Sequence, residues 1–122
     1  MKLAEVQTIL RSEVLCGLEN LNREIVTACG ADLMSDVLVY TKERTLLLTG
    51  LTNIQVVRTA EVGDLMGIIF VRGKRPGPEV IEMAKAKGIP LMITELSMFD
   101  TCGMLHSRGI RGCSERVTPD EL

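Results

Sequence analysis

Two short segments of this sequence carry residue types that bind phosphate groups. Residues 49–53 contain two hydroxyls, an amide and a glycine, and residues 72–75 contain three cations and a glycine. Hydroxyls, amides and the backbone N–H groups at a helix start attract anions, and Arg and Lys supply positive charge. Two further polar residues, Thr94 and Ser97, follow another apolar run later in the chain. Together these residues predict a binding site for a nucleotide or another phosphate ligand. The candidate residues are Thr49, Gly50, Thr52, Asn53, Arg72, Gly73, Lys74, Arg75, Thr94 and Ser97.

The elements that must position these residues are three apolar runs, at residues 46–48, 68–71 and 91–94. None of the three alternates between apolar and polar residues, and helical patterns separate them. Apolar strands of this kind, joined by helices, are typical of a buried parallel sheet. Because the carboxyl ends of parallel strands meet at one edge of a sheet, we expect the candidate residues to lie along a common edge.

The first forty residues predict a short amphipathic helix over residues 3–11 and two strands, at 13–16 and 24–29. The two strands can pair as a hairpin or flank the parallel unit, and the residues leave both arrangements open. Asp32 is a plausible N-cap for the next helix.

The second half of the chain predicts two further helices. One begins at Pro78, a favoured residue at the first helical position, and ends before Gly88. The other begins after Ser97, with an acid three residues later. We therefore predict a single three-layer α/β domain over residues 1–110, with a mixed, mainly parallel sheet and flanking helices, followed by a polar tail over residues 111–122.

The loop residues also have an ordinary interpretation. Thr-Gly and Arg-Gly pairs are common turns, and the three cations can be solvated or can pair with Glu79 and Asp64. Both interpretations are compatible with the sequence.

The sequence lacks a recognisable catalytic set. A phosphate-transferring kinase needs a loop of the form GxxxxGK[ST], and the nearest string, residues 67–74, has one residue too many and no Ser or Thr after its lysine. The single histidine, His106, lies late in the last helix, and no positioned partner can be named for it. We therefore predict that the chain is not an enzyme.

The four cysteines have no close pair, whereas zinc and iron–sulfur sites usually take two thiolates from one short loop. We predict no metal ligands and no resident cofactor, and the spacing argues against an iron–sulfur cluster within one chain. Three residues are weak redox candidates: Cys29 at a strand end, Cys102 on the core face of the last helix, and Cys113, which we expect to be exposed in the tail.

Composition excludes several classes of partner. The net charge is −2, the pI is near 5.4 and aromatic residues make up 2% of the chain, so neither a basic footprint nor a stacking platform for nucleic acid is present. No apolar stretch approaches the length of a membrane span, and no leader is recognisable. We expect a cytoplasmic protein that binds neither nucleic acid nor membrane.

Four segments together give the sequence a family resemblance. It resembles the DRTGG-domain family, most closely its small stand-alone members, and through them it is similar to the N-terminal domain of HPr kinase/phosphorylase. The namesake Asp-Arg-Thr-Gly-Gly string is absent, and residues 50–53 occupy the corresponding loop. The segments are Asp32-Leu-Met-Ser-Asp36, Leu47-Leu-Thr-Gly-Leu-Thr-Asn53, Phe70-Val-Arg-Gly-Lys-Arg-Pro76 and Leu96-Ser-Met-Phe99.

The resemblance implies a non-catalytic regulatory or accessory domain, able to sense a nucleotide or other phosphate ligand. It also implies a homodimer, with a larger metabolic or redox enzyme as a partner, and strands 13–16 or 24–29 could pair at a dimer edge. An alternative stays open: a redox accessory protein associated with hydrogenases, which uses its cysteines for thiol or iron–sulfur chemistry.

Overall fold

The computed structural model of the chain describes residues 1–40 and 42–113. A six-stranded sheet lies at its centre, with the order β1-β5-β4-β3-β2-β6. In chain order the elements are α1 (Leu3–Leu10), β1 (Glu13–Cys16), the 3₁₀ helix η1 (Leu18–Asn20), β2 (Thr27–Gly30), α2 (Met34–Tyr40), β3 (Thr45–Thr49), α3 (Ile54–Val62), β4 (Gly67–Phe70), α4 (Pro78–Lys87), β5 (Leu91–Ile93), α5 (Met98–Ser107) and β6 (Arg111–Gly112).

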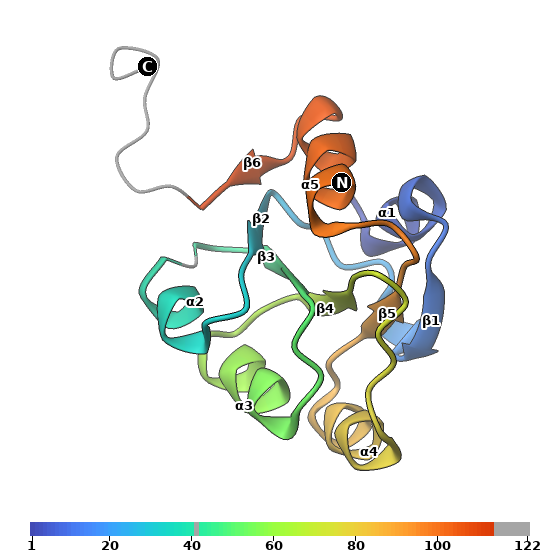
Figure 1. Cartoon of the computed structure of the whole chain (residues 1–122), viewed down its shortest axis with the longest axis vertical. Coiled ribbons are helices and arrows are strands. Elements are labelled where there is room, and N and C mark those ends of the chain that lie inside the picture. The colour runs from blue at the N-terminus through green and yellow to red at the C-terminus, as the bar shows by residue number, and fades with distance from the viewer. Residues whose placement is uncertain (41, 114–122) are drawn as a thin grey trace.

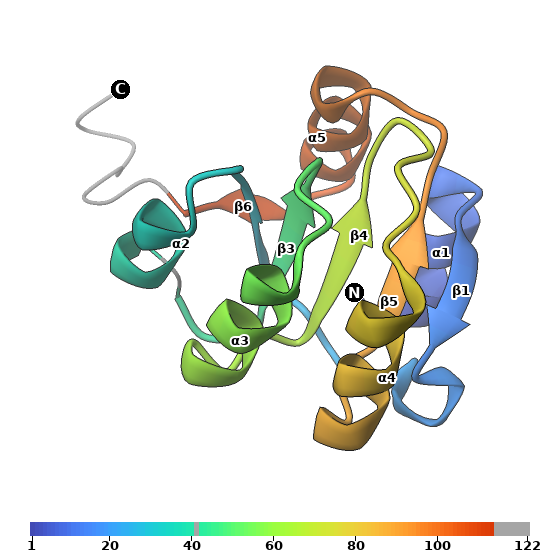
Figure 2. The same ribbon diagram turned by 60° about the horizontal axis from the view of Figure 1, so that its bottom comes forward.

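Helices cover both faces of the sheet. Figure 1 and Figure 2 show α2, α3 and α4 on one face and α1 and α5 on the other. Two apolar clusters fill the two interlayer spaces. One joins α2, α3 and α4 to the sheet through residues such as Val37, Val57 and Ala84, and the other joins α1 and α5 through residues such as Leu3 and Leu105. The predicted three-layer α/β architecture is confirmed.

The sheet is mainly parallel, as predicted. β2, β3, β4, β5 and β6 run parallel to one another, and β1 pairs antiparallel with β5. The central strands β3 and β4 are buried along their whole length, which explains why their residues do not alternate between apolar and polar.

The structure decides between the two arrangements that the sequence left open for the first strands. β1 and β2 do not form a hairpin, because β1 lies beside β5 and β2 lies between β3 and β6. The strand predicted over 24–29 is therefore not an edge strand, and its regular part is β2 (Thr27–Gly30). Residues 111 and 112, the start of the predicted tail, pair with β2 as β6, and residues 114–122 lie outside the described part.

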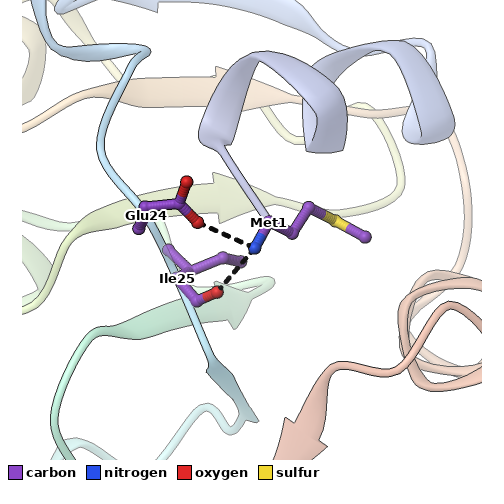
Figure 3. Close-up of polar contacts among 3 residues, drawn as sticks. All are labelled: Met1, Glu24 and Ile25. Atoms are coloured by element: carbon purple, nitrogen blue, oxygen red, sulfur yellow. Dashed lines mark hydrogen bonds and ion pairs between the residues drawn. The ribbon is translucent and has the colours of Figure 1, made fainter.

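The amino end of the chain is held by a polar contact (Figure 3). The amino group of Met1 lies 3.0 Å from Glu24 Oε2 and donates to the carbonyl oxygen of Ile25 at 3.2 Å. The hydrogen bond and charge of the amino group lower the pKa of Glu24. This contact holds the start of α1 against the segment that leads into β2.

None of the described helices is long and apolar enough to span a lipid bilayer.

Candidate functional site

The predicted site residues follow the carboxyl ends of three adjacent parallel strands. β3 ends at Thr49, β4 at Phe70 and β5 at Ile93, and these strands are direct neighbours in the sheet. The loops that follow them therefore lie along one edge, as the sequence predicted. We call this edge, formed by residues 31–33, 49–53, 71–77 and 94–97, the loop rim.

Asp32 organises the first part of the loop rim. Its Oδ1 accepts a hydrogen bond from Thr49 Oγ1 at 2.9 Å and another from the backbone N–H of Gly50 at 2.9 Å. The prediction that Asp32 caps a helix is wrong, because α2 begins at Met34 and the carboxylate reaches across to the loop after β3. The sequence reasoning missed this role. The available signal was the position of Asp32, two residues after a strand that ends at the same edge.

Lys74 joins the second loop to the first. Its Cδ lies 3.8 Å from the position that a Cβ would occupy on Gly50, so the Lys74 side chain packs beside the glycine of the loop after β3. Arg72 stands two residues earlier, exposed, with a left-handed backbone at φ 57°. Among the described residues, no side chain forms an ion pair or hydrogen bond with the side-chain nitrogens of Arg72 or Lys74. Two cations are thus available on the rim.

Backbone hydrogen bonds tie the cationic loop to the loop after β5. The N–H of Arg72 donates to the carbonyl oxygen of Leu96 at 2.9 Å, and the N–H of Gly73 donates to Thr94 O at 2.8 Å. The Glu95 carboxylate packs against Gly73, with Oε2 2.5 Å from a would-be Cβ. The rim therefore carries two carboxylates, from Asp32 and Glu95, beside its two cations.

Three of the candidate residues on the loop rim have side chains that are engaged in contacts of the fold. Arg75 forms an ion pair with Glu13 of β1 at 2.7 Å, which places its charge toward the β1 edge. Thr94 is buried and donates to the carbonyl oxygen of Leu10 at 2.8 Å. Ser97 caps α5 by accepting from Asp100 N.

Three backbone N–H groups in the loop after β3 and at the start of α3 are already bonded within the chain. Gly50 N donates to Asp32, Leu51 N donates to Thr49 Oγ1 at 3.1 Å, and Gln55 N donates to the Asn53 side chain at 3.1 Å. Asn53 therefore uses its amide oxygen as the cap of α3. Thr52, which immediately precedes this cap, is half-buried.

A second group of predicted residues comes together at β2. Cys29 lies in β2, Cys113 directly follows β6, and Cys102 Sγ lies 3.0 Å from the would-be Cβ of Gly30, the next residue of β2. The expectation that Cys113 is exposed is wrong, because only 8% of its surface is accessible. Cys102 packs against the core on the α1 and α5 side, as predicted, and burial raises its pKa.

The thiols of Cys29 and Cys113 lie close enough to shift each other's pKa. The Cys29 thiol lowers the pKa of Cys113, and the hydroxyls of Thr45 and Thr27 add to the effect against the opposing effect of burial. The Cys113 thiol, together with burial, raises the pKa of Cys29. One thiol of the pair is thus favoured as a thiolate, and the other keeps its proton.

Three remaining features are the single histidine, the groups that could hold a metal ion, and a surface groove. His106 is exposed in the last turn of α5. Within residues 1–40 and 42–113, no three His, Cys, Asp or Glu side chains are grouped closely enough to hold a metal ion. An open surface groove lies along α1, lined in part by Glu5, Ile9 and Arg108, and it contains none of the predicted residues.

Comparison with known proteins identifies a family and a solved structure of similar fold. A family model described as the DRTGG domain matches residues 5–108. A crystal structure of the CBS and DRTGG domains of the regulatory region of Clostridium perfringens pyrophosphatase, complexed with the activator diadenosine tetraphosphate, matches with a TM-score of 0.69 and 18% sequence identity. The match covers 85% of the present chain and 45% of the pyrophosphatase chain, so this chain spans less than half of that relative. No curated protein matches.

Proposed function

This chain belongs to the DRTGG-domain family, and from that premise we propose that it is a non-catalytic regulatory or accessory domain that binds a nucleotide or another phosphate-bearing ligand. The ligand would lie on the loop rim, with its phosphates at Arg72 and Lys74. The similar pyrophosphatase regulatory region was crystallised with a dinucleotide activator, which supports the ligand class.

The observation that carries this proposal is the position of Lys74 over Gly50. A Cβ on residue 50 would lie 3.8 Å from Lys74 Cδ and 3.8 Å from Asp32 Oδ1, so the aliphatic part of Lys74 packs beside Gly50 at van der Waals distance. Lys74 therefore lies beside the loop that leads into α3, and the helix dipole at the start of α3 also favours an anion.

The two carboxylates of the rim narrow the ligand class. Asp32 and Glu95 repel phosphate, but a carboxylate accepts hydrogen bonds from ribose hydroxyls and from an exocyclic amine. A nucleotide offers both a phosphate for the cations and donors for the carboxylates. Inorganic pyrophosphate offers only the anion, so we expect a nucleotide to bind more tightly.

Calorimetric titration tests this function. The protein is titrated with AMP, ATP, diadenosine tetraphosphate and inorganic pyrophosphate, and then the titrations are repeated with Lys74→Gln and Arg72→Gln. A hydrogen bond to a charged group contributes about 1.5–3 kcal/mol, so each substitution should lower the affinity for the nucleotide about tenfold or more.

Arg75→Gln is the matched control, because it removes the same charge from the same loop. Arg75 is engaged with Glu13 at 2.7 Å and should not contact the ligand. An equal loss of nucleotide affinity in Arg75→Gln would show that the effect depends only on the overall positive charge of the loop. The absence of binding heat for every compound would refute the ligand site.

We also propose that the domain forms a homodimer and docks on a larger metabolic or redox enzyme. Of the two strands considered for pairing, β1 is the one that leaves an edge open among the described residues, because β2 is covered by β6. Sedimentation velocity at protein concentrations from roughly 1 to 100 μM should show a dimer. A single monomeric species across this range would remove the dimer from the proposal.

A further inference from the structure

Two cysteines that are far apart in the sequence lie side by side on adjacent strands. β2 and β6 are parallel, with Ala28 opposite Gly112, so Cys29 and Cys113 are the next residues in the same register. Cys113 Sγ donates to the carbonyl oxygen of Ala28 at 3.5 Å, and the Cys29 and Cys113 thiols lie close enough to shift each other's pKa. The two sulfur atoms therefore share one face at the β2–β6 edge.

We propose that Cys29 and Cys113 are a redox-active pair that forms a reversible intramolecular disulfide on reaction with a peroxide. The inference is independent of the loop-rim ligand, because neither cysteine belongs to the loop rim.

The backbone separation suits this bond. Neighbouring strands lie about 4.7–4.9 Å apart, which falls within the range of about 4.4–6.8 Å that a disulfide spans between Cα atoms. Residues in register on adjacent strands also project to the same side of the sheet. The new bond needs only a rotation of two side chains, with no movement of the strands.

The other cysteines are positioned differently. Cys102 approaches the side of Gly30, and successive residues of a strand point to opposite faces, so Cys102 lies on the opposite face from Cys29. Cys16 belongs to β1, which is separated from β2 by three strands. The geometry thus selects one pair out of four cysteines.

The immediate surroundings favour reaction at Cys113. The neighbouring Cys29 thiol, the Thr45 and Thr27 hydroxyls and the Lys42 backbone lower the pKa of Cys113. A thiolate, not a thiol, attacks a peroxide. Cys29, whose pKa is raised, holds a proton that the second step needs.

The reaction balances with one peroxide. The Cys113 thiolate attacks one oxygen of hydrogen peroxide, the O–O bond breaks, and the products are a Cys113 sulfenic acid and hydroxide, which takes up a proton to become water. The Cys29 sulfur then attacks the sulfenic sulfur, and its proton leaves with the hydroxyl group as a second water. Two thiols lose one electron each, and the two peroxide oxygens gain them.

Peptide mapping after oxidation tests the pair directly. The reduced full-length protein is treated with a small excess of hydrogen peroxide, alkylated, and digested with trypsin. Cleavage after Lys and Arg places the four cysteines in four separate peptides, residues 12–23, 24–42, 88–108 and 112–116. We expect peptide 24–42 linked to peptide 112–116, an intact mass lower by two hydrogens, and full reversal by a thiol reductant.

Three variants assign the roles of the two cysteines and provide a control. Cys29→Ser should stop the reaction at a Cys113 sulfenic acid, which a dimedone-type reagent traps. Cys113→Ser should abolish both the sulfenic acid and the linked peptides. Cys102→Ser is the matched control and should give the same linked peptides as the natural sequence.

Several results would overturn the proposal. These are a linked peptide that contains residue 16 or 102, a disulfide between two molecules, or oxidation of Cys113 to a sulfinic acid with no linkage while Cys29 is intact. An unchanged thiol content after treatment would do the same, since unfolded protein under the same conditions provides the positive control for oxidation.

Discussion

Single side chains decide how the loop rim is assembled, and Asp32 is the main example. It is exposed, yet both of its described hydrogen bonds involve one oxygen and link the loop after β2 to the loop after β3. Thr49, its partner, is fully buried and also accepts from Leu51 N. Hydrogen bonds therefore join neighbouring loops of the rim to each other, and Arg72 and Lys74 belong to a loop that is held in this way.

We predict that Asp32→Asn destabilises the domain by about 1 kcal/mol, since charge-assisted hydrogen bonds contribute about 1.5–3 kcal/mol and solvent exposure reduces this value. Urea unfolding measures the change. Asp64→Asn is the control, because Asp64 is exposed at φ 53° and asparagine also tolerates the left-handed region. An equal effect in both variants would contradict the specific role of Asp32.

The Met1–Glu24 contact has a pH dependence whose sign follows from the direction of the pKa shift. The folded state lowers the pKa of Glu24, through the hydrogen bond and the charge of the Met1 amino group. The contact therefore stabilises the fold above the ordinary pKa of a glutamate, and its contribution disappears as the pH falls through the lower pKa of the folded state.

We predict that Glu24→Gln reduces the free energy of unfolding at pH 7 and that the difference from the natural sequence shrinks below about pH 4. Urea titrations over this pH range, on chains that begin at Met1, give the result. Glu5→Gln, in the first turn of α1, provides a comparison without the Met1 contact. A difference that stays constant down to the lowest pH would show that the ion pair is not its cause.

At the scale of elements, the packing of β1 depends on a turn that only glycine allows. Gly17 follows β1 at φ 87°, and a Cβ there would lie 2.5 Å from the Cα of Pro90, just before β5. The contacting atom belongs to the backbone and cannot rotate away. The antiparallel β1–β5 pair is thus fixed at its end by the absence of a side chain.

We predict that Gly17→Ala lowers the free energy of unfolding by about 2–4 kcal/mol, from the left-handed backbone and the close contact with Pro90. Gly103→Ala is the opposite case, because Gly103 lies within α5 and a Cβ there meets nothing within 4 Å. It should stabilise the domain by about 0.5–1 kcal/mol through helix propensity. Thermal unfolding of both variants gives the comparison, and a similar sign in the two would contradict the argument.

At the scale of the whole molecule, the last described strand, β6, forms one edge of the sheet and lies beside β2. β6 has two residues and pairs with β2, so its attachment rests on few hydrogen bonds. A bond between Cys29 and Cys113 would join these strands and enclose most of the chain in one covalent loop.

We predict that the oxidised protein is more stable to urea than the reduced protein, by up to about 4–5 kcal/mol, because a long closed loop restricts the unfolded chain. Cys102→Ser should keep this gain and Cys29→Ser should lose it. A disulfide that forms without raising the urea midpoint would show that native-state strain cancels the loop effect.

The sequence by itself determined the layers, the parallel core and the common edge of the site loops. Those features follow from local signals: the apolar runs of β3 and β4, the glycine and proline that bound α4, and the Ser97 cap. Such signals act within a few residues, so they can be read without knowledge of the fold.

Only the tertiary structure decided which polar groups meet. Asp32 contacts Gly50 instead of capping its own helix, Arg75 faces Glu13, and Cys113 is buried beside Cys29. Each of these contacts joins residues on different strands or loops, and their partners depend on strand order. Strand order is set by the packing of the whole chain, which is why no local pattern contained it.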